Sequence, residues 1–426
     1  MKLTISSVMI SVLIASSVSA VPVRRHQKNK MMMAPKGNSA ASSAVGAAYF
    51  ITNEPSGNFV VAASIGSDGK LTLQQATSSE GVGSHGLPDL AGPDALFTQG
   101  AVKASNDGQV LATVNAGSNT VSLFSIDPKN PTALQLIGKP VGSGGEFPVS
   151  LAFNKAGSML CALNGGFVNG VACFNVDKTK GLTPIANTLR SLSLNQTTPA
   201  TGPAGSASHV IFSEDESQLI ASVKGVPPTP GIFAIWDIAS DKSLSSNFKA
   251  VQPATGGLLP FSMTVIPGKN AVLATDAGIG ADILDLSGEN AGGVAGGKSS
   301  ILNITGQGAT CWSSHSTQTG NFYLTDILTN EVTEVNVDDN LKPTIVQQYS
   351  QGTGVATIDN DIATVNKQDF MFVLAANATQ VKVLSLNAPG KATALQTLDI
   401  SGPAKSAGLT VNAANLQGMT SFISSA

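Results

Sequence analysis

The chain has 426 residues, of which 12% are charged, and its formal net charge at pH 7 is -3. This weak acidic charge argues against nucleic acid as a partner, because phosphate binding needs clustered cations. The scarcity of charged residues also argues against long charged helices, and the 44 glycines favour short strands joined by turns.

The first 20 residues have the pattern of a secretory signal peptide. Lys2 precedes an apolar stretch at 3–18, and the small residues that follow favour cleavage after Ala20. The stretch contains five serines and is shorter than a membrane span requires. A dibasic processing site at Arg24-Arg25 lies in a low-complexity tail at 21–44. We therefore expect a secreted protein, extracellular or associated with the cell wall, with no membrane span and with its folded domain at 45–426.

A repeated unit begins clearly at Gln99. Strands are predicted at 102–105, 109–114, 121–127 and 134–138, with turn residues such as Asn106-Asp107-Gly108 between them. Four antiparallel strands in about 45 residues correspond to one blade of a β-propeller. Further copies start at Pro148, Ala207, Pro260, Ala309 and Thr357.

The seventh blade is predicted to be split between the two ends of the chain. Residues from Ala47 match the second, third and fourth strands of a blade, and no first strand precedes them. Leu416 to Phe422 resembles the opening of the next blade and supplies the missing strand. Pairing the chain ends in one sheet removes the open edges of the ring. We therefore predict an all-β, seven-bladed propeller in a single domain.

Three cysteines suit an oxidising destination. Cys161 and Cys173 lie on consecutive strands at equal distances from the hairpin centre near Phe167, so they would face each other across the ladder. They form either a cross-strand disulfide or two ordinary buried residues. Cys311 begins an innermost strand. Burial against a neighbouring blade is a simpler interpretation of this residue than a reactive thiol.

Three sequons mark acceptor sites for N-glycosylation, at Asn195, Asn303 and Asn377. In a secreted chain each indicates surface. A glycan buried between blades would contradict the predicted strand register.

Polar residues recur at the ends of the second strands and at the starts of the first strands, where they would surround the mouth of the central channel. The candidate ligand-binding residues are Asn53, Asn115, Asn164, Lys224, Asp276, Asp326 and Asp361. Ser150, Ser262 and Cys311 start further first strands. Turn formation by Asn and Asp is the alternative for most of these positions taken singly.

His209 is the candidate acid or base of this mouth, since it faces the channel from a first strand. Glu54 is the candidate catalytic carboxylate. We find no zinc spacing, phosphate loop or cofactor motif, so no metal and no cofactor are predicted.

The connection 78–97 is long for a propeller, and long connections are usually functional or mobile. Our hypothesis is a flap over the channel that carries His85, Asp89 and Asp94. Its content of Gly and Pro equally fits a disordered insertion.

The repeats resemble the lactonase-type seven-bladed propellers, the group of 6-phosphogluconolactonase and the fungal 3-carboxymuconate lactonizing enzyme. The stretches YFITNEPSGNFVVAASIGSDGKLTL, GGEFPVSLAF, CALNGGFVNGVACFNVD, LPFSMTV, QGATCWSSHS and ANLQGM resemble more closely a family of secreted fungal glycoproteins labelled 3-carboxymuconate cyclase-like. The likeness covers nearly all of residues 45–423 and implies the propeller fold and secretion.

This sequence differs from the lactonizing propellers at their catalytic motif. The lactonizing propellers share Pro-Arg-His at the start of a first strand and Asn-Glu at the end of the second. Here the stretches are Ala207-Ser208-His209 and Val223-Lys224, so Ser208 replaces the Arg and Lys224 replaces the Glu. An Arg would bind a carboxylate bidentately, and Lys224 with the nearby Lys103 would hold a polyanion more weakly.

Two functions therefore remain open. One is a muconate lactonizing enzyme or lactone hydrolase, with His209 as acid or base and Lys224 binding carboxylate. The other is a monomeric, non-catalytic glycoprotein that binds a small carboxylate, lactone or carbohydrate, or a partner at the cell wall or surface. The missing Arg and Glu, and a location outside the cell, favour the second.

Overall fold

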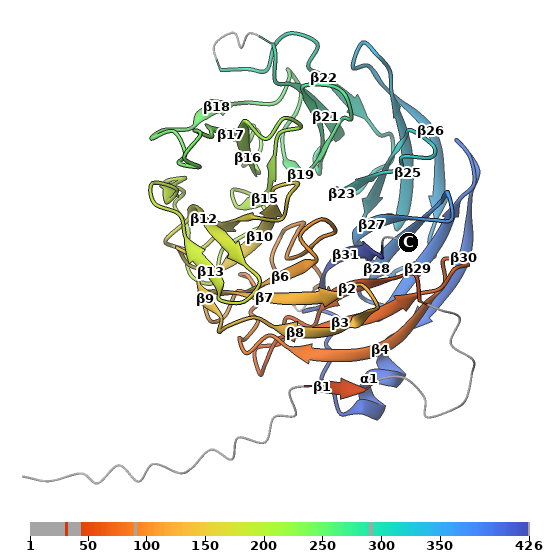
Figure 1. Cartoon of the computed structure of the whole chain (residues 1–426). Helices are drawn as coiled ribbons and strands as arrows, with labels where there is room; N and C mark the ends of the chain where they lie inside the picture. Colours follow the sequence, from red (N-terminus) through yellow and green to blue (C-terminus); the bar gives the residue numbers. More distant parts are fainter. Residues whose placement is uncertain (1–29, 33–43, 89–91, 289–292, 425–426) are drawn as a thin grey trace, which may run out of the picture.

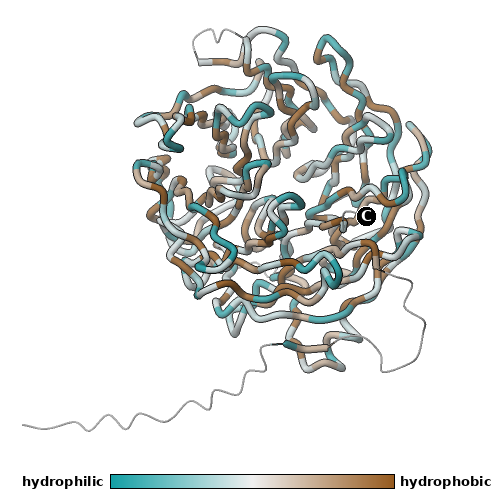
Figure 2. The backbone as a smooth tube through the Cα atoms, in the orientation of Figure 1, coloured by the Kyte–Doolittle hydropathy of each residue, from teal (hydrophilic) through white to brown (hydrophobic). Residues whose placement is uncertain are grey.

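The computed structural model describes residues 30–32, 44–88, 92–288 and 293–424. Seven sheets are arranged around a central axis, as the sequence predicts, and α1 (Ser401–Ala407) is a single short helix outside them (Figure 1). Hydrophobic residues run along the strands and hydrophilic ones occupy many of the turns (Figure 2). The predicted signal peptide, its cleavage after Ala20 and the site at Arg24-Arg25 lie outside the described residues.

The first three blades each contain a fifth strand. Blade 1 consists of β31 (Gln417–Ile423), β2 (Gly46–Ile51), β3 (Phe59–Ile65), β4 (Leu71–Ser78) and β1 (Lys30–Met32). Blade 2 consists of β5 (Val102–Ser105), β6 (Val110–Asn115), β7 (Thr120–Asp127), β8 (Asn130–Leu136) and β9 (Val141–Gly142). Blade 3 consists of β10 (Pro148–Phe153), β11 (Met159–Asn164), β12 (Gly170–Asp177), β13 (Gly181–Pro184) and β14 (Arg190–Ser191). Strand β1 pairs with the outer edge of the fourth strand, whereas β9 and β14 pair with the third strands of their blades.

Blades 4 to 7 have four strands each. Blade 4 is β15 (Ala207–Phe212), β16 (Gln218–Val223), β17 (Ile232–Asp237) and β18 (Lys249–Val251), and blade 5 is β19 (Pro260–Val265), β20 (Ala271–Asp276), β21 (Gly280–Asp285) and β22 (Ser300–Asn303). Blade 6 is β23 (Thr310–His315), β24 (Phe322–Asp326), β25 (Glu331–Val337) and β26 (Pro343–Ser350). Blade 7 is β27 (Thr357–Val365), β28 (Gln368–Ala375), β29 (Gln380–Leu386) and β30 (Ala392–Asp399).

The two chain ends close the ring in blade 1, which confirms the predicted split blade. The C-terminal strand β31 is the innermost strand and pairs antiparallel with β2, with Tyr49 opposite Thr420. It contacts the inner strands β5 and β27 of the neighbouring blades. The inner edge of every blade is therefore covered by its neighbours, which removes the exposed edges that an open sheet would present.

One detail of the N-terminal prediction was wrong. Residues 30–32, which composition assigns to an unpacked tail, form β1 and pair with Gln75 to Thr77 of β4. An outermost strand offers unpaired backbone N–H and C=O groups, and a passing segment satisfies them. Met31 adds an apolar contact to the neighbouring core.

The segment 98–100 reaches across the central channel before β5 begins, and we call it the crossing segment. The Gln99 side chain exchanges two hydrogen bonds with the Ser313 backbone of blade 6, at 3.0 and 3.1 Å. The backbone carbonyl of Gln99 accepts a hydrogen bond from Ser150 Oγ of blade 3 at 2.7 Å. The Thr98 carbonyl accepts from Trp312 Nε1 at 2.8 Å and from Gln417 Nε2 at 3.2 Å. The Thr98 hydroxyl group donates to the Ser208 carbonyl of blade 4. The crossing segment thus links four blades and divides the channel into two ends.

Cys161 and Cys173 lie opposite each other on β11 and β12, and a disulfide joins them. Both residues are buried within blade 3. Cys311 is a free, buried thiol at the start of β23, and burial raises its pKa well above the ordinary value.

We expect Gln99→Leu to lower the free energy of unfolding by about 2 to 4 kcal/mol. The apolar side chain has a similar size but leaves the buried N–H and C=O of Ser313 without those two partners. Chemical denaturation monitored by tryptophan fluorescence measures the change. The control is Gln347→Leu, on the exposed face of β26, which should change stability by less than about 0.5 kcal/mol. Equal effects at both positions would refute the structural role of the crossing segment.

Candidate functional site

A cavity of about 330 Å³ lies at one mouth of the channel, on the face where the loops after second and fourth strands gather. We call it the mouth cavity. Blades 4, 5 and 6 and the connection 78–97 line it. Its walls are mainly apolar and include Phe97, Phe261 and Trp312. Phe261 and Trp312 pack edge to face with ring centroids 5.1 Å apart, which makes one wall rigid and aromatic.

Lys224 supplies the amine of this cavity from the end of blade 4's second strand, where the repeat predicts it. The side chain is 3% exposed, and Nζ donates to the Phe97 carbonyl at 2.8 Å and to the Ala207 carbonyl at 3.5 Å. Nζ also lies 4.5 Å from the centroid of the Phe261 ring. Among the described residues no carboxylate lies within salt-bridge distance of it.

Asp94 provides a carboxyl group that lines the same cavity. Its Oδ1 accepts from the Thr98 N–H and from Gln417 Nε2, both at 3.1 Å. Burial lowers the pKa of Lys224 and raises the pKa of Asp94, and the charge of each group partly opposes the shift of the other. An amine and a carboxyl group whose pKa values burial moves toward neutrality therefore share one apolar cavity.

The connection 78–97 is held over the channel by backbone hydrogen bonds in its described part. Leu87 N–H donates to Ala200 at 2.7 Å, and Gly202 N–H donates back to Leu87 at 2.9 Å. His85 directs Nδ1 to the Gly86 carbonyl and Nε2 to the Gly92 carbonyl, at 2.8 and 2.9 Å, and its side chain lines the mouth cavity. The third residue assigned to the predicted flap, Asp89, lies outside the described residues.

Three asparagines of the predicted ring serve the loops rather than the cavity. Asn53 has φ 47°, and its amide donates to the Ser84 carbonyl at 2.8 Å. Asn115 accepts from Asn58 and Ser79 and donates to Thr120 and Ser122, so all its hydrogen-bonding capacity is used. Asn164 exchanges hydrogen bonds with Ser143. None of these three side chains binds the backbone of its own turn, so the turn-forming alternative is wrong for Asn115 and Asn164, whose side chains tie their strand ends to other segments.

Asp276 and Asp326 occupy equivalent positions in blades 5 and 6 and bind backbone N–H groups. Asp276 accepts from Leu258, Leu259 and Gly278, at 2.6, 2.9 and 2.7 Å. Asp326 accepts from four N–H groups, including Gly308 at 2.7 Å. These carboxylates shape the loops around the mouth, and neither lines the mouth cavity.

The candidate catalytic pair is not brought together in the mouth cavity. His209 is 2% exposed and lies beside the crossing segment, where a Cβ on Gly100 would come within 3.2 Å of its ring. Its Nδ1 accepts from the Met263 N–H at 3.0 Å. Glu54 accepts from the Asn412 N–H at 2.8 Å, on the loop that precedes β31. Neither residue lines the cavity that contains Lys224.

The Nδ1 hydrogen bond fixes the protonation of His209. Because Nδ1 accepts from a backbone N–H, the neutral ring carries its proton on Nε2, and this nitrogen has no hydrogen-bond partner among the described residues. Burial holds the pKa of His209 well below the ordinary value, and the charge of Lys103 lowers it further. A histidine that acts as acid or base together with a carboxylate needs a hydrogen bond between the two. Among the described residues no carboxylate makes such a bond with the His209 ring.

The other candidate residues on the first strands lie inside the channel, where most of them form hydrogen bonds with neighbouring strands or with the crossing segment. Asp361 accepts from Ser421 Oγ of β31 at 2.7 Å, and burial raises its pKa. Ser150 binds the crossing segment, and Ser262 Oγ lies 2.9 Å from Ser313 Oγ. Only Cys311 of these positions lines the mouth cavity.

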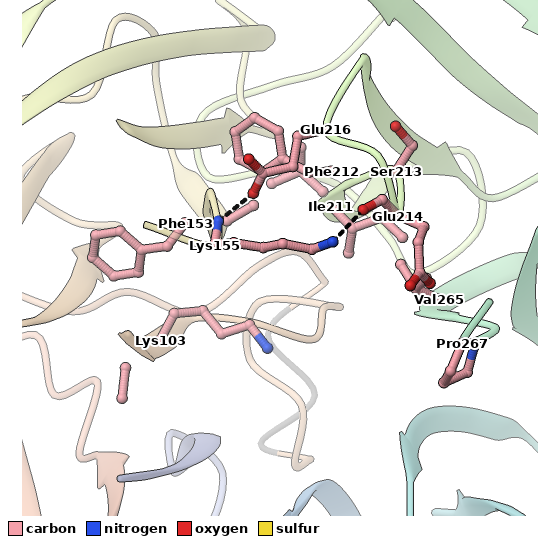
Figure 3. A pocket seen from close by; sticks show the side chains of 13 residues that line it. Lys103, Phe153, Lys155, Ile211, Phe212, Ser213, Glu214, Glu216, Val265 and Pro267 are labelled. Carbon is pink, nitrogen blue, oxygen red and sulfur yellow. Dashed lines mark hydrogen bonds between the residues drawn. The ribbon is translucent and has the colours of Figure 1, made fainter. Parts of the chain in front are cut away.

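A second cavity, of about 400 Å³, opens at the other end of the channel, where the hairpins between first and second strands meet (Figure 3). Lys103 and Lys155 extend across it in the same direction, and Lys155 hydrogen-bonds to Glu214 and Glu216. Sequence reasoning placed Lys103 near the mouth beside Lys224, which was wrong. The crossing segment lies between the two cavities, and Lys224 is the only lysine or arginine among the described lining residues of the mouth cavity.

The three sequon asparagines are exposed. Asn195 and Asn377 lie in loops, and Asn303 ends β22. A glycan at any of them would project from the molecule without disturbing a core, which is compatible with the strand register.

Sequence reasoning missed the apolar walls of the mouth cavity. Trp312 and Phe261 belong to a chain with only 5% aromatic residues, and each follows the first residue or two of an inner strand. Because aromatic residues are so scarce in this chain, their presence at the start of two inner strands was the sequence signal that could have indicated an aromatic wall. Within the described ranges no group of three His, Cys, Asp or Glu side chains is arranged to hold a metal ion. In the same part of the chain no helix has the length and apolar character needed to cross a membrane.

Comparison with known proteins agrees with this architecture. Residues 38–197 match the family model described as lactonase, seven-bladed β-propeller. No curated protein matches the sequence. The chain is thus a lactonase-like propeller in its first blades by sequence, and a seven-bladed propeller throughout by structure.

Among solved structures, the periplasmic gluconolactonase of Pseudomonas aeruginosa is 16% identical, with a TM-score of 0.59 over 83% of this chain and 96% of that one. A candidate 6-phosphogluconolactonase of Bacteroides uniformis is 14% identical, with a TM-score of 0.60 over 84% and 97%. A protein of Desulfotomaculum acetoxidans described as functionally unknown is 12% identical, with a TM-score of 0.59 over 88% and 99%. At these identities the likeness concerns the fold.

We expect Lys224→Met to lose stability relative to the wild type as the pH rises. In the wild type the folded chain binds fewer protons at Lys224 than the unfolded chain does, because burial lowers the folded-state pKa below the ordinary value of 10.5. Wild-type stability therefore gains with pH between these two pKa values, and the variant lacks this gain. Between about pH 7 and about pH 9 the unfolding free energy of the wild type should therefore rise by about 1 to 2 kcal/mol relative to that of Lys224→Met.

Urea denaturation at both pH values measures this difference. The control is Lys178→Met, whose side chain is exposed and whose charge is solvated in both states. A difference for Lys224→Met that does not vary with pH would contradict the buried environment of its amine.

Proposed function

We propose that this protein is a secreted, monomeric, non-catalytic binding glycoprotein of the 3-carboxymuconate cyclase-like kind. Its ligand is a small, mainly apolar molecule with one carbonyl or carboxylate group, held in the mouth cavity. The observation that carries the proposal is the combination of aromatic and aliphatic walls with a single buried amine, Lys224.

The charge of the cavity limits the chemistry of the ligand. The sequence has three arginines, at 24, 25 and 190, and Arg190 binds the backbone of residues 244 and 245 on the outside of the ring. A sugar phosphate or a tricarboxylate needs several cations or a bidentate Arg. A cavity with one amine and a nearby carboxyl group favours a ligand with at most one anionic group.

The environment of His209 argues for binding without catalysis. Its Nδ1 lone pair is taken by the Met263 N–H, and the ring does not line the mouth cavity. A general base needs a free lone pair within hydrogen-bond reach of the proton that it removes. The absence of the family's Arg and Glu at positions 208 and 224 supports the same conclusion.

A lactonase-type or muconate-lactonizing enzyme is the second candidate. The match of residues 38–197 to the lactonase family favours it, as does the unpaired, buried Nε2–H of His209 among the described residues. That N–H can donate a hydrogen bond to a developing oxyanion.

The surface features fit a protein that works outside the cell. Exposed acceptor asparagines at 195, 303 and 377 suit glycosylation, and the outer loops of the blades offer contacts to carbohydrate or to a partner at the cell wall. The weak acidic charge gives no reason to expect nucleic acid.

Filling the mouth cavity should abolish binding of small apolar ligands. Ala309 lines the cavity, so Ala309→Phe should weaken the binding of 1-naphthalenemethanol by at least about tenfold, since the ring occupies the ligand's space. Titration by tryptophan fluorescence is suitable because Trp312 forms part of the wall.

The matched control is Ala104→Phe, which makes the same change in the cavity at the other end of the channel. Its affinity should stay at the wild-type value. Loss of binding in both variants, or in neither, would rule out the mouth cavity as the binding site.

An assay of turnover separates the two candidate functions. We expect the purified protein and its His209→Ala variant to leave 3-carboxymuconate and a panel of lactones unchanged in a spectrophotometric assay, because His209 has no free base and no access to the mouth cavity. Turnover by the wild type that His209→Ala abolishes, with circular dichroism unchanged, would establish a lactonase-type enzyme instead.

A further inference from the structure

The amine of Lys224 is a nucleophile of the mouth cavity to which the binding function assigns no covalent role. It is buried, lies at an apolar wall and has no described carboxylate within 4.0 Å. Its three N–H bonds meet two backbone carbonyls and the face of Phe261, all of which are neutral. A lysine amine in such surroundings is the usual partner of carbonyl compounds in imine chemistry.

We propose that the mouth cavity captures aldehydes or ketones covalently, through a reversible imine between Lys224 Nζ and the carbonyl carbon of an apolar ligand. This inference rests on the proposed binding function and names the ligand class more narrowly. It assigns Lys224 as the reacting group and Asp94 as the group that moves protons.

The reaction balances with groups that the cavity contains. The neutral amine forms a C–N bond to the carbonyl carbon as the C=O π bond breaks; the oxygen takes up one proton and the nitrogen gives one up, which gives a carbinolamine. The hydroxyl group then leaves as water with a second proton, the nitrogen lone pair forms the C=N bond, and the nitrogen gives up its remaining proton. Asp94, whose Oδ1 is fixed by Thr98 and Gln417, donates and accepts these protons in turn. The net change is amine plus carbonyl to imine plus water, with no oxidant or reductant.

The surrounding groups tolerate the movement of Lys224 that the reaction requires. The Phe97 carbonyl, its nearest partner, also accepts from Ser208 Oγ at 3.2 Å, so it keeps a donor when the amine turns to a ligand. Burial lowers the pKa of Lys224, which raises the fraction of free amine at neutral pH. The apolar walls exclude bulk water, which slows hydrolysis of the imine.

The test uses 1-naphthaldehyde with the full-length protein at pH 7 and sodium cyanoborohydride to reduce any imine to a stable amine. Intact mass and peptide mapping then locate the adduct. We expect one adduct per chain, at Lys224, formed at least about tenfold faster than at any other lysine. Lys224→Met and Lys224→Arg should both lose it; the second variant keeps a cation and its donors in place.

The control variant is Lys103→Met, which changes a lysine of the other cavity and should retain the adduct. The alcohol 1-naphthalenemethanol, which has no carbonyl group, tests binding alone. If the alcohol binds and no adduct forms at Lys224, the imine proposal fails while the binding proposal stands. If the alcohol does not bind, the proposed binding function fails. If the adducts are spread over surface lysines, the imine proposal fails as well.

Discussion

The hydrogen bonds of the crossing segment are the constraint on which the interior of this propeller depends. A seven-bladed ring has an open centre, and its inner strands present side chains there without a facing sheet. Residues 98–100 fill that centre and bind blades 1, 3, 4 and 6 through Gln417, Ser150, Ser208 and Trp312 with Ser313. Because the buried polar groups of the segment have partners on four blades, a shift of any one of these blades would break hydrogen bonds to the segment.

The same segment explains why the two ends of the channel differ in chemistry. On one side it carries Phe97 and Asp94 into the mouth cavity, whose other walls come from blades 4 to 6. On the other side the hairpins between first and second strands bring lysines and glutamates together around Lys103 (Figure 3). A ligand in one cavity does not reach the other, so the cations Lys103 and Lys224 cannot act on the same molecule.

Fold and site differed in how far the sequence could predict them. Period-2 alternation and turn residues are local, so the blades, their strand starts and the closure by β31 follow from the sequence. The position of Lys224 at the mouth follows from the repeat as well. The crossing segment does not, because Gln99 and Ser313 are 214 residues apart and their pairing depends on the size of the ring. Lys103 was misplaced for this reason, since the repeat fixes its strand but not the end of the channel to which its side chain turns.

The asparagines and aspartates of the mouth show the other limit of pattern reasoning. Asp276 and Asp326 recur because each loop needs an acceptor for its backbone N–H groups, and a repeated fold repeats that need. Asn115 instead accepts from the side chains of Asn58 and Ser79. Repetition therefore indicates a structural role, and the residues that break the repeat carry the chemical information. Val223 occupies the position of Asp276 and Asp326 in its blade. Lys224 follows it and stands where blades 5 and 6 have the apolar residues Ala277 and Ile327, which also line the mouth cavity.

Burial of Lys224 near Asp94 is unfavourable for the fold, since both groups lose hydration and no described contact brings them within salt-bridge distance. Replacing the pair by apolar residues would complete the surrounding wall of Phe97, Phe261 and Trp312. An arrangement that buries two ionisable groups without pairing them is typical of a functional site, where the charge states of such groups serve a ligand. The mouth cavity, rather than the channel around His209, is therefore the place where this propeller differs from a purely structural one.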